Sequence, residues 1–90
     1  MRVRVELYAS LRERAGAKEV ELELPQGSTL ADLVELLRER VGVGSGELGA
    51  LKILIDGRPA EGLGGLRAPL RDGCSVSVFP PLAGGLEEGS

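Results

Sequence analysis

Polar and apolar side chains alternate strictly along the stretch Arg2-Val3-Arg4-Val5-Glu6-Leu7-Tyr8. Because successive side chains of a strand point to opposite faces, this period of two predicts a strand with its valines and leucine buried. The stretch Lys18-Glu19-Val20-Glu21-Leu22-Glu23-Leu24 repeats the pattern, with Val20, Leu22 and Leu24 inward. Antiparallel pairing of the two stretches would set arginines against glutamates, which stabilises a strand pair modestly. Residues 9–15 are expected to form a short helical turn, followed by a turn at 15–17.

A helical period replaces the strand period after Pro25. Thr29 and Asp32 have the spacing of a capping box, and Gly42 is a natural helix stop. These features predict a helix over residues 29–41. Its apolar stripe recurs at helical spacing: Leu30, Leu33, Val34, Leu37 and Val41.

The second half of the chain predicts shorter elements. Residues 51–55 are apolar and partly β-branched, and Asp56-Gly57 after them is typical of a hairpin turn with a brief return strand. Residues 61–69 are expected to be irregular, and Asp72-Gly73 to form another turn. Residues 74–79 predict the last strand, with Cys74, Val76 and Val78 inward and Ser75, Ser77 and Phe79 outward.

The element order predicts an α+β fold, because one amphipathic helix must cover its stripe against one face of a sheet. With the last strand beside the first, this is the β-grasp or ubiquitin-like layout, a mixed sheet of about four to five strands on one main helix. We expect residues 1–81 to form the domain and residues 82–90 a flexible C-terminal tail.

The composition of the 90-residue chain fits one small domain with an aliphatic core. Hydrophobic residues make up 42% and charged residues 28%, with one Tyr, one Phe and no Trp. A net charge of −3 argues against nucleic-acid binding, whose affinity comes mainly from neutralised phosphates. The chain shows no export segment and no apolar stretch long enough to span a membrane, so we expect a cytoplasmic protein.

The missing residue types argue against catalysis by this chain alone. It has no His and one Cys, so it offers no imidazole base, no internal disulfide and no paired metal ligands. The single Cys74 lies on the inward face of its predicted strand and is interpreted as a small buried hydrophobe, not as a sulfur relay. Function is therefore expected in a surface, a terminus or a partner.

The most distinctive segment is Val78-Phe79-Pro80-Pro81-Leu82-Ala83-Gly84-Gly85. Two prolines favour an extended path away from the domain, and two glycines let a partner close tightly around the backbone. A Gly-Gly pair near a terminus is often only a flexible spacer. Placed behind Phe-Pro-Pro at the end of a β-grasp pattern, it favours a functional tail. If the chain ended at Gly85, ATP could activate the free carboxylate as an acyl-adenylate.

The chain resembles the MoaD family, the small sulfur-carrier subunit of molybdopterin synthase, over residues 1–85. Thiamine sulfur carriers of the ThiS type share the fold and the Gly-Gly end, but they are usually shorter and lack the Phe-Pro-Pro. The resemblance is carried by residues 3–9, Leu11-Arg12-Glu13, residues 25–37, residues 69–73 and residues 76–85.

This resemblance implies a carrier that is not itself an enzyme and binds no cofactor or metal. A MoeB-type, E1-like adenylyltransferase would use ATP to adenylate Gly85, and a sulfur donor would convert the adenylate to a thiocarboxylate. A MoaE-type large subunit, which holds the catalytic residues, would use that sulfur on a pterin precursor. Ala83 and Gly84 would thread into the partner, which Phe79, Pro80, Pro81 and Leu82 would contact.

Residues 86–90 depart from the pattern of relatives that end at Gly-Gly. While they remain, Gly85 carries an amide and not a carboxylate, so either a processing peptidase removes them or they were appended to the natural protein. Three alternatives stay open: a ubiquitin-like protein modifier, a sulfur carrier for thiamine or tRNA thiolation, and an interaction domain that is never activated.

Overall fold

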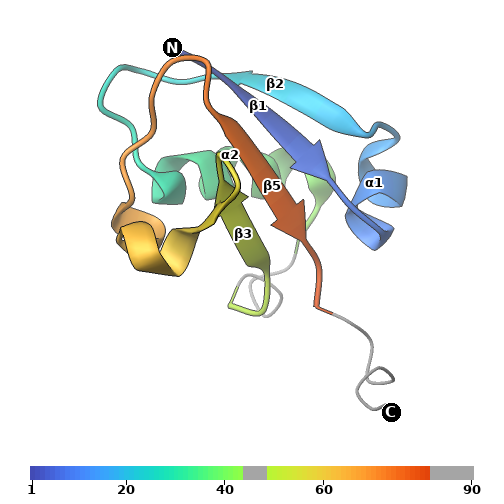
Figure 1. Cartoon of the computed structure of the whole chain (residues 1–90). Coiled ribbons are helices and arrows are strands. Elements are labelled where there is room, and N and C mark those ends of the chain that lie inside the picture. The colour runs from blue at the N-terminus through green and yellow to red at the C-terminus, as the bar shows by residue number, and fades with distance from the viewer. Residues whose placement is uncertain (44–48, 82–90) are drawn as a thin grey trace.

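The computed structural model describes residues 1–43 and 49–81 of the chain. Its elements follow the predicted order, with a short helix between the first two strands and two short 3₁₀ helices before the last strand (Figure 1). They are β1 (Arg2–Leu7), α1 (Ser10–Ala15), β2 (Glu19–Glu23), α2 (Leu30–Val41), β3 (Lys52–Ile55), β4 (Arg58–Pro59), η1 (Ala60–Leu63), η2 (Gly65–Arg67) and β5 (Ser75–Phe79).

The strands form one mixed sheet in the order β2-β1-β5-β3-β4. β1 is antiparallel to β2 and parallel to β5, while β3 is antiparallel to both β4 and β5. Figure 1 shows β5 between β1 and β3, with α2 crossing behind the sheet. The predicted β-grasp class and the pairing of the last strand with the first are therefore confirmed.

The core lies between α2 and the inner face of the sheet. The apolar stripe of α2 is buried as predicted, and it packs in one cluster with the inward residues of β1 and β5. The inner face of β2 is less covered, because β2 is an edge strand: Leu22 is buried but Val20 is only half-buried. The fully buried side chains include Val3, Val5, Leu7, Leu33, Val76 and Val78.

The charged outer face of β1 and β2 has the predicted pairing. Arg2 lies opposite Glu23, with its Nε 3.0 Å from the Glu23 carboxylate, and Arg4 Nε lies 3.8 Å from Glu19. The hydrogen bond from Arg2 to Glu23, together with the nearby carboxylate charges, raises the pKa of Arg2 above its usual value. These pairs are exposed, so they set the strand register more than they stabilise the fold.

The boundaries of α2 follow the predicted capping. Thr29 is the N-cap, and the Asp32 carboxylate accepts a hydrogen bond from the Thr29 backbone N–H at 2.9 Å. Gly42 ends the helix in the left-handed conformation with φ 74°. The capping box and the glycine stop are both confirmed, and α2 begins one residue after the predicted start.

Residues 61–69 were expected to be irregular, but they contain most of η1, which begins at Ala60, and all of η2, so that prediction was wrong. Gly64 and Gly65 both have positive φ, and they let the chain turn between the two short helices. The segment is tied to the start of α2, where the Leu30 N–H donates to Ala68 O at 2.9 Å and the Leu70 N–H donates to Ser28 O at 3.1 Å. These contacts join residues about forty positions apart, so local periodicity could not predict them.

Candidate functional site

The end of β5 is where the chain leaves the sheet. Its last pair with β1 is Leu7 and Val78, and its last pair with β3 is Lys52 and Phe79. Pro80 and Pro81 follow, and neither has an N–H to extend the ladder. Pro80 is half-buried and Pro81 is exposed, so the chain passes from the sheet into solvent over these two residues (Figure 1).

The Phe79 ring stacks on the Tyr8 ring. Their centroids are 4.3 Å apart and the ring planes differ by 14°. These are the only two aromatic rings of the chain. Phe79 lies on the outer face as predicted, but it is half-buried because Tyr8 covers one side of its ring. The sequence placed Tyr8 on the same outer face, but the pairing of the two rings depends on the parallel register of β1 and β5.

Polar groups hold the Tyr8 ring in place. The Tyr8 hydroxyl donates a hydrogen bond to Glu6 Oε1 at 3.2 Å, and the Ser77 hydroxyl donates to the same oxygen at 3.2 Å. The guanidinium carbon of Arg12 lies 5.7 Å from the Tyr8 ring centroid, and Arg12 Nε donates to Leu7 O at 3.3 Å. No sequence pattern marks this set, which groups around the end of β5 only in three dimensions.

The outer face of the sheet divides into a half with several ion pairs and a half whose side chains are mostly neutral. The charged half lies on β1 and β2, with the arginine and glutamate pairs. The other half, here called the outer patch, lies on β3 and β5: Leu54, Ser75, Ser77 and Phe79 are half-buried, and Lys52, the partner of Phe79 in the register, is exposed. A mostly neutral surface that includes an aromatic ring is suited to contact with a protein partner.

Four of the predicted site residues lie outside the described residues: Leu82, Ala83, Gly84 and Gly85. Their roles, and the predicted boundary between domain and tail after residue 81, remain predictions. The three that are described, Phe79, Pro80 and Pro81, follow one another at the edge of the outer patch.

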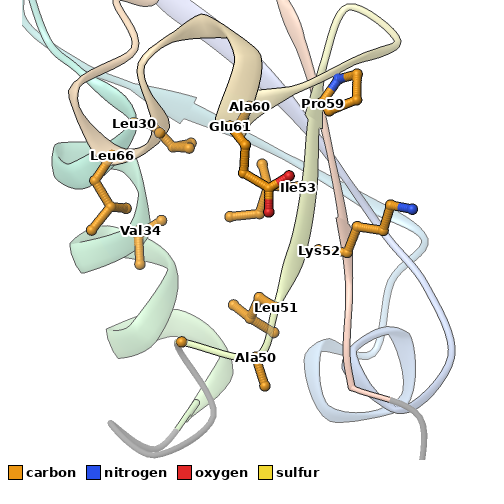
Figure 2. Close-up of a pocket in the computed structure, with 12 residues that line it drawn as sticks. Leu30, Val34, Ala50, Leu51, Lys52, Ile53, Pro59, Ala60, Glu61 and Leu66 are labelled. Carbon is orange, nitrogen blue, oxygen red and sulfur yellow. The ribbon is translucent and has the colours of Figure 1, made fainter.

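A groove lies between α2 and β3, with a volume of about 550 Å³ (Figure 2). Its walls are mainly apolar, with Leu30 and Val34 on the helix and Leu51 and Ile53 on the strand side. Leu66 on its rim is 57% exposed. Lys52 and Glu61 are the charged residues of the lining, so the groove offers apolar contact and no acid–base set.

Cys74 and the candidate metal ligands are the remaining reactive side chains of the described part of the chain. Cys74 is 5% exposed within the core cluster, which confirms its interpretation as a small buried hydrophobe. Among residues 1–43 and 49–81, no three His, Cys, Asp or Glu side chains gather where they could share a metal ion. No helix in this part is long and apolar enough to cross a membrane.

Ala9, next to the aromatic stack, has a strained backbone. Its φ of 53° and ψ of −129° lie in a region that glycine adopts readily and other residues rarely. Such strain costs on the order of 1–3 kcal/mol, partly offset by the extra chain entropy of glycine. We expect Ala9→Gly to raise the free energy of unfolding by about 1 kcal/mol, as measured by urea denaturation.

Ala31→Gly is the matched control for this prediction. Ala31 lies in α2 with ordinary helical geometry, so the same change there should lower the free energy of unfolding by about 0.5–1 kcal/mol. Opposite changes in the free energy of unfolding for the two variants would identify relief of strain at Ala9. A destabilised Ala9→Gly variant would contradict the strain.

A five-stranded mixed sheet that holds one long helix, with its last strand paired to its first, defines a ubiquitin-like β-grasp protein. A family model described as the ThiS family matches residues 5–85. The chain therefore belongs to the ThiS family.

Individual relatives are of two kinds. The chain is 33% identical to small archaeal modifier protein 3 of Haloferax volcanii, over 94% of this chain and all of that one. It is 31% identical to a putative molybdopterin converting factor, subunit 1, of Pyrococcus furiosus, with a TM-score of 0.77 over 91% of this chain and 99% of that one. A chain of the complex of subunits 1 and 2 of the Helicobacter pylori molybdopterin-converting factor is 25% identical, with a TM-score of 0.65 over 94% of this chain and all of that one.

These likenesses define the coarse function. The chain is a small carrier of the ThiS/MoaD type or a ubiquitin-like modifier, and proteins of this type are generally not catalytic themselves. The predicted MoaD resemblance is confirmed at the level of the family and of its structural neighbours. Known structures of such neighbours include complexes, which supports a protein partner in general.

Proposed function

We propose that this chain is the sulfur-carrier small subunit of a molybdopterin synthase. The observation that carries the proposal is the position of Phe79-Pro80-Pro81 at the end of β5, with Gly84-Gly85 three and four residues beyond Pro81. The likeness to the Pyrococcus furiosus protein, whose name is that of a molybdopterin converting factor, supports this assignment.

The proposed chemistry takes place on the carboxylate of Gly85. One carboxylate oxygen attacks the α-phosphorus of ATP, pyrophosphate leaves, and the product is a mixed anhydride of Gly85 with AMP. The nucleophilic sulfur of a persulfide or of sulfide then attacks the acyl carbon, and AMP leaves. Sulfide gives the thiocarboxylate directly. A persulfide gives an acyl disulfide, whose S–S bond a second thiol cleaves to leave the thiocarboxylate on the carrier and a disulfide between the donor and that thiol. The described residues supply no acid–base set for these steps, so the MoeB-type activating enzyme must supply it.

The extension beyond Gly85 must be removed first. With residues 86–90 attached, the acyl carbon of Gly85 belongs to a peptide bond, and an amide has no carboxylate oxygen to attack ATP. If residues 86–90 belong to the natural protein, a processing peptidase that hydrolyses the bond between Gly85 and Leu86 would release the carboxylate. The proposal therefore includes this cleavage as its first step.

The outer patch is the proposed contact for the MoaE-type large subunit. Its side chains are mostly neutral with Lys52 as the charged member, it includes Phe79, and it lies directly beside the point where the chain leaves the sheet. The four residues from Leu82 to Gly85 can reach at most roughly 13–14 Å beyond Pro81. A partner that binds the outer patch must therefore place its active site within that distance of the patch edge.

A protein modifier is the second candidate, and the likeness to small archaeal modifier protein 3 favours it. Both functions begin with the same adenylate and differ in the nucleophile, which is a lysine amine of a target protein in the modifier and sulfur in the carrier. Sulfur transfer for thiamine or tRNA thiolation would follow the carrier chemistry with another acceptor. A chain that is never cleaved after Gly85 would be an interaction domain only.

Reconstitution tests the proposed function. The chain ending at Gly85 would be incubated with a MoeB-type enzyme, ATP and a sulfur donor, and then with the large subunit and the pterin precursor. We expect the carrier to gain one sulfur in place of one oxygen, by intact mass, and the dithiolene product to appear. A carrier that gains sulfur but gives no product with the large subunit would contradict the molybdopterin role and favour another acceptor.

Phe79→Ala is expected to weaken binding to the large subunit more than it weakens folding. A central aromatic anchor typically costs about 2 kcal/mol of binding free energy when truncated. Its half-buried stack with Tyr8 is worth on the order of 1 kcal/mol to the fold. Isothermal titration and urea denaturation measure the two losses.

Val20→Ala is the control for Phe79→Ala, because Val20 is also half-buried but lies on the edge strand β2, away from the outer patch. It should lower stability and leave binding unchanged. Equal losses of binding and stability in Phe79→Ala would make Phe79 a residue of the fold and not of the interface.

A further inference from the structure

The stack of Tyr8 and Phe79 is the last contact between β5 and the β1 side of the sheet before the chain leaves it. The backbone pairing of β1 with β5 ends at Leu7 and Val78. Phe79 remains paired with Lys52 of β3, but toward β1 it is held through its ring. Pro80 and Pro81 then have no N–H to donate. The direction of the chain at Pro80 therefore depends on how Phe79 is fixed.

The Tyr8 ring is itself fixed by groups from three elements. Glu6 of β1 accepts its hydroxyl proton, and the same Glu6 oxygen accepts from Ser77 of β5. Arg12 of α1 lies over the ring. A rotation of the Tyr8 side chain would break the stack and the hydrogen bond to Glu6 together. Tyr8 is thus a rigid support for Phe79 and not a loosely packed surface ring.

The backbone after Tyr8 is strained in a way that supports this arrangement. The positive φ of Ala9 starts α1 within two residues of Tyr8 and brings Arg12 over its ring. Strain of this kind persists where the surrounding structure requires it, and it concentrates at functional positions. The local geometry is therefore built around the position of Tyr8.

We propose that Tyr8 is a positioning residue: through its stack with Phe79 it sets the direction in which Pro80 and Pro81 leave the sheet. The inference deepens the proposed function and rests on it, because the activating enzyme must take hold of a tail that starts where Pro81 leaves the domain. Proline fixes its own φ and restricts the residue before it, so the orientation of Phe79 is passed on through Pro80 and Pro81. Tyr8 itself does not touch the reacting atoms.

The structural half of the proposal is tested by NMR on the full chain, in wild type, Tyr8→Leu and Tyr8→Phe. Order parameters of the Cα–Hα bonds of Pro80 and Pro81 are measured for each. We expect values near 0.85 in wild type and in Tyr8→Phe, which keeps the stack, and values below about 0.6 in Tyr8→Leu. Thermal unfolding checks that each variant is folded. Unchanged order parameters in folded Tyr8→Leu would overturn the proposal.

The functional half is tested by the rate of adenylation of chains ending at Gly85. We expect Tyr8→Leu to lower kcat/KM by about 10- to 100-fold, because misplacement of a reacting group by about 1 Å has effects of this size. Tyr8→Phe should restore most of the rate. Since the two rings act as one unit, the double variant Tyr8→Leu/Phe79→Leu should be no slower than the slower single variant.

The two failures can be told apart. Equal kcat/KM for wild type and Tyr8→Leu would overturn the positioning role while leaving the proposed function in place. A wild-type chain ending at Gly85 that is never adenylated would overturn the proposed function, and with it the claim that the direction serves activation. The order parameters would still decide whether Tyr8 orients the prolines.

Discussion

A chain that ends at Gly84 is expected to fold as the full chain does and to lose transfer of activated sulfur. The described core consists of residues between Val3 and Val78, so the residues removed are not members of it. The terminal carboxylate, however, is withdrawn by one residue, roughly 3.3–3.6 Å along an extended chain. A displacement of this size from the reacting position should lower the rate at least about 100-fold.

The matched control is the chain that ends at Gly85. Both chains should unfold at the same temperature, while only the Gly85 chain should release pyrophosphate with the activating enzyme and ATP and then accept sulfur. Undiminished transfer from the chain ending at Gly84 would contradict the assignment of Gly85 as the activated residue.

Leu33→Ala is expected to have the largest effect on stability among single substitutions proposed for this chain. Leu33 is fully buried at the centre of the α2 stripe, where it faces the inner side of the sheet. Truncation of a buried leucine costs about 2–5 kcal/mol, through lost apolar burial and the cavity left behind. A domain of this size has a total stability on the order of 5–10 kcal/mol, so the substitution should remove a large share of it.

Leu66→Ala is the control for Leu33→Ala, because it makes the same chemical change at a side chain that is 57% exposed. Its effect should stay within about 0.5 kcal/mol. Urea denaturation followed by circular dichroism measures both. Similar small losses in the two variants would show that α2 does not close the core.

The strands β1 and β2 and the helix α2 could be predicted from the sequence because their apolar residues recur with a clear period. β1 and β2 alternate over five or more residues, and the stripe of α2 is bounded by a capping box and a glycine. The cross-strand charges of Arg2 and Glu23 followed from the antiparallel pairing. Local pattern and tertiary packing agree in these elements, which is the condition under which such predictions succeed.

The remaining features depend on contacts between distant residues. η1 and η2 form in a Gly- and Leu-rich segment with no period, and they are held against the start of α2 by hydrogen bonds such as Leu30 N–H to Ala68 O. The positive φ of Ala9 has no marker in the sequence, because alanine is not a residue that predicts it. Such features are set by the tertiary fold.

The candidate site divides in the same way. The order of residue types alone is enough to select the candidate residues Phe79, Pro80, Pro81 and the Gly-Gly pair. Two prolines restrict the backbone, and the two glycines after them have no side chains. The support of Phe79 by Tyr8 and Glu6 could not be predicted from the sequence, because it requires the parallel register of β1 and β5.

The mass of this protein purified from its own cells tests the central claim most directly. The account predicts a population that lacks residues 86–90 and carries sulfur in place of one oxygen of the Gly85 carboxylate. Attachment of Gly85 to lysines of other proteins would favour the modifier instead. A chain that keeps Ser90 as its last residue under all growth conditions would contradict both, because Gly85 would then never have a carboxylate to activate.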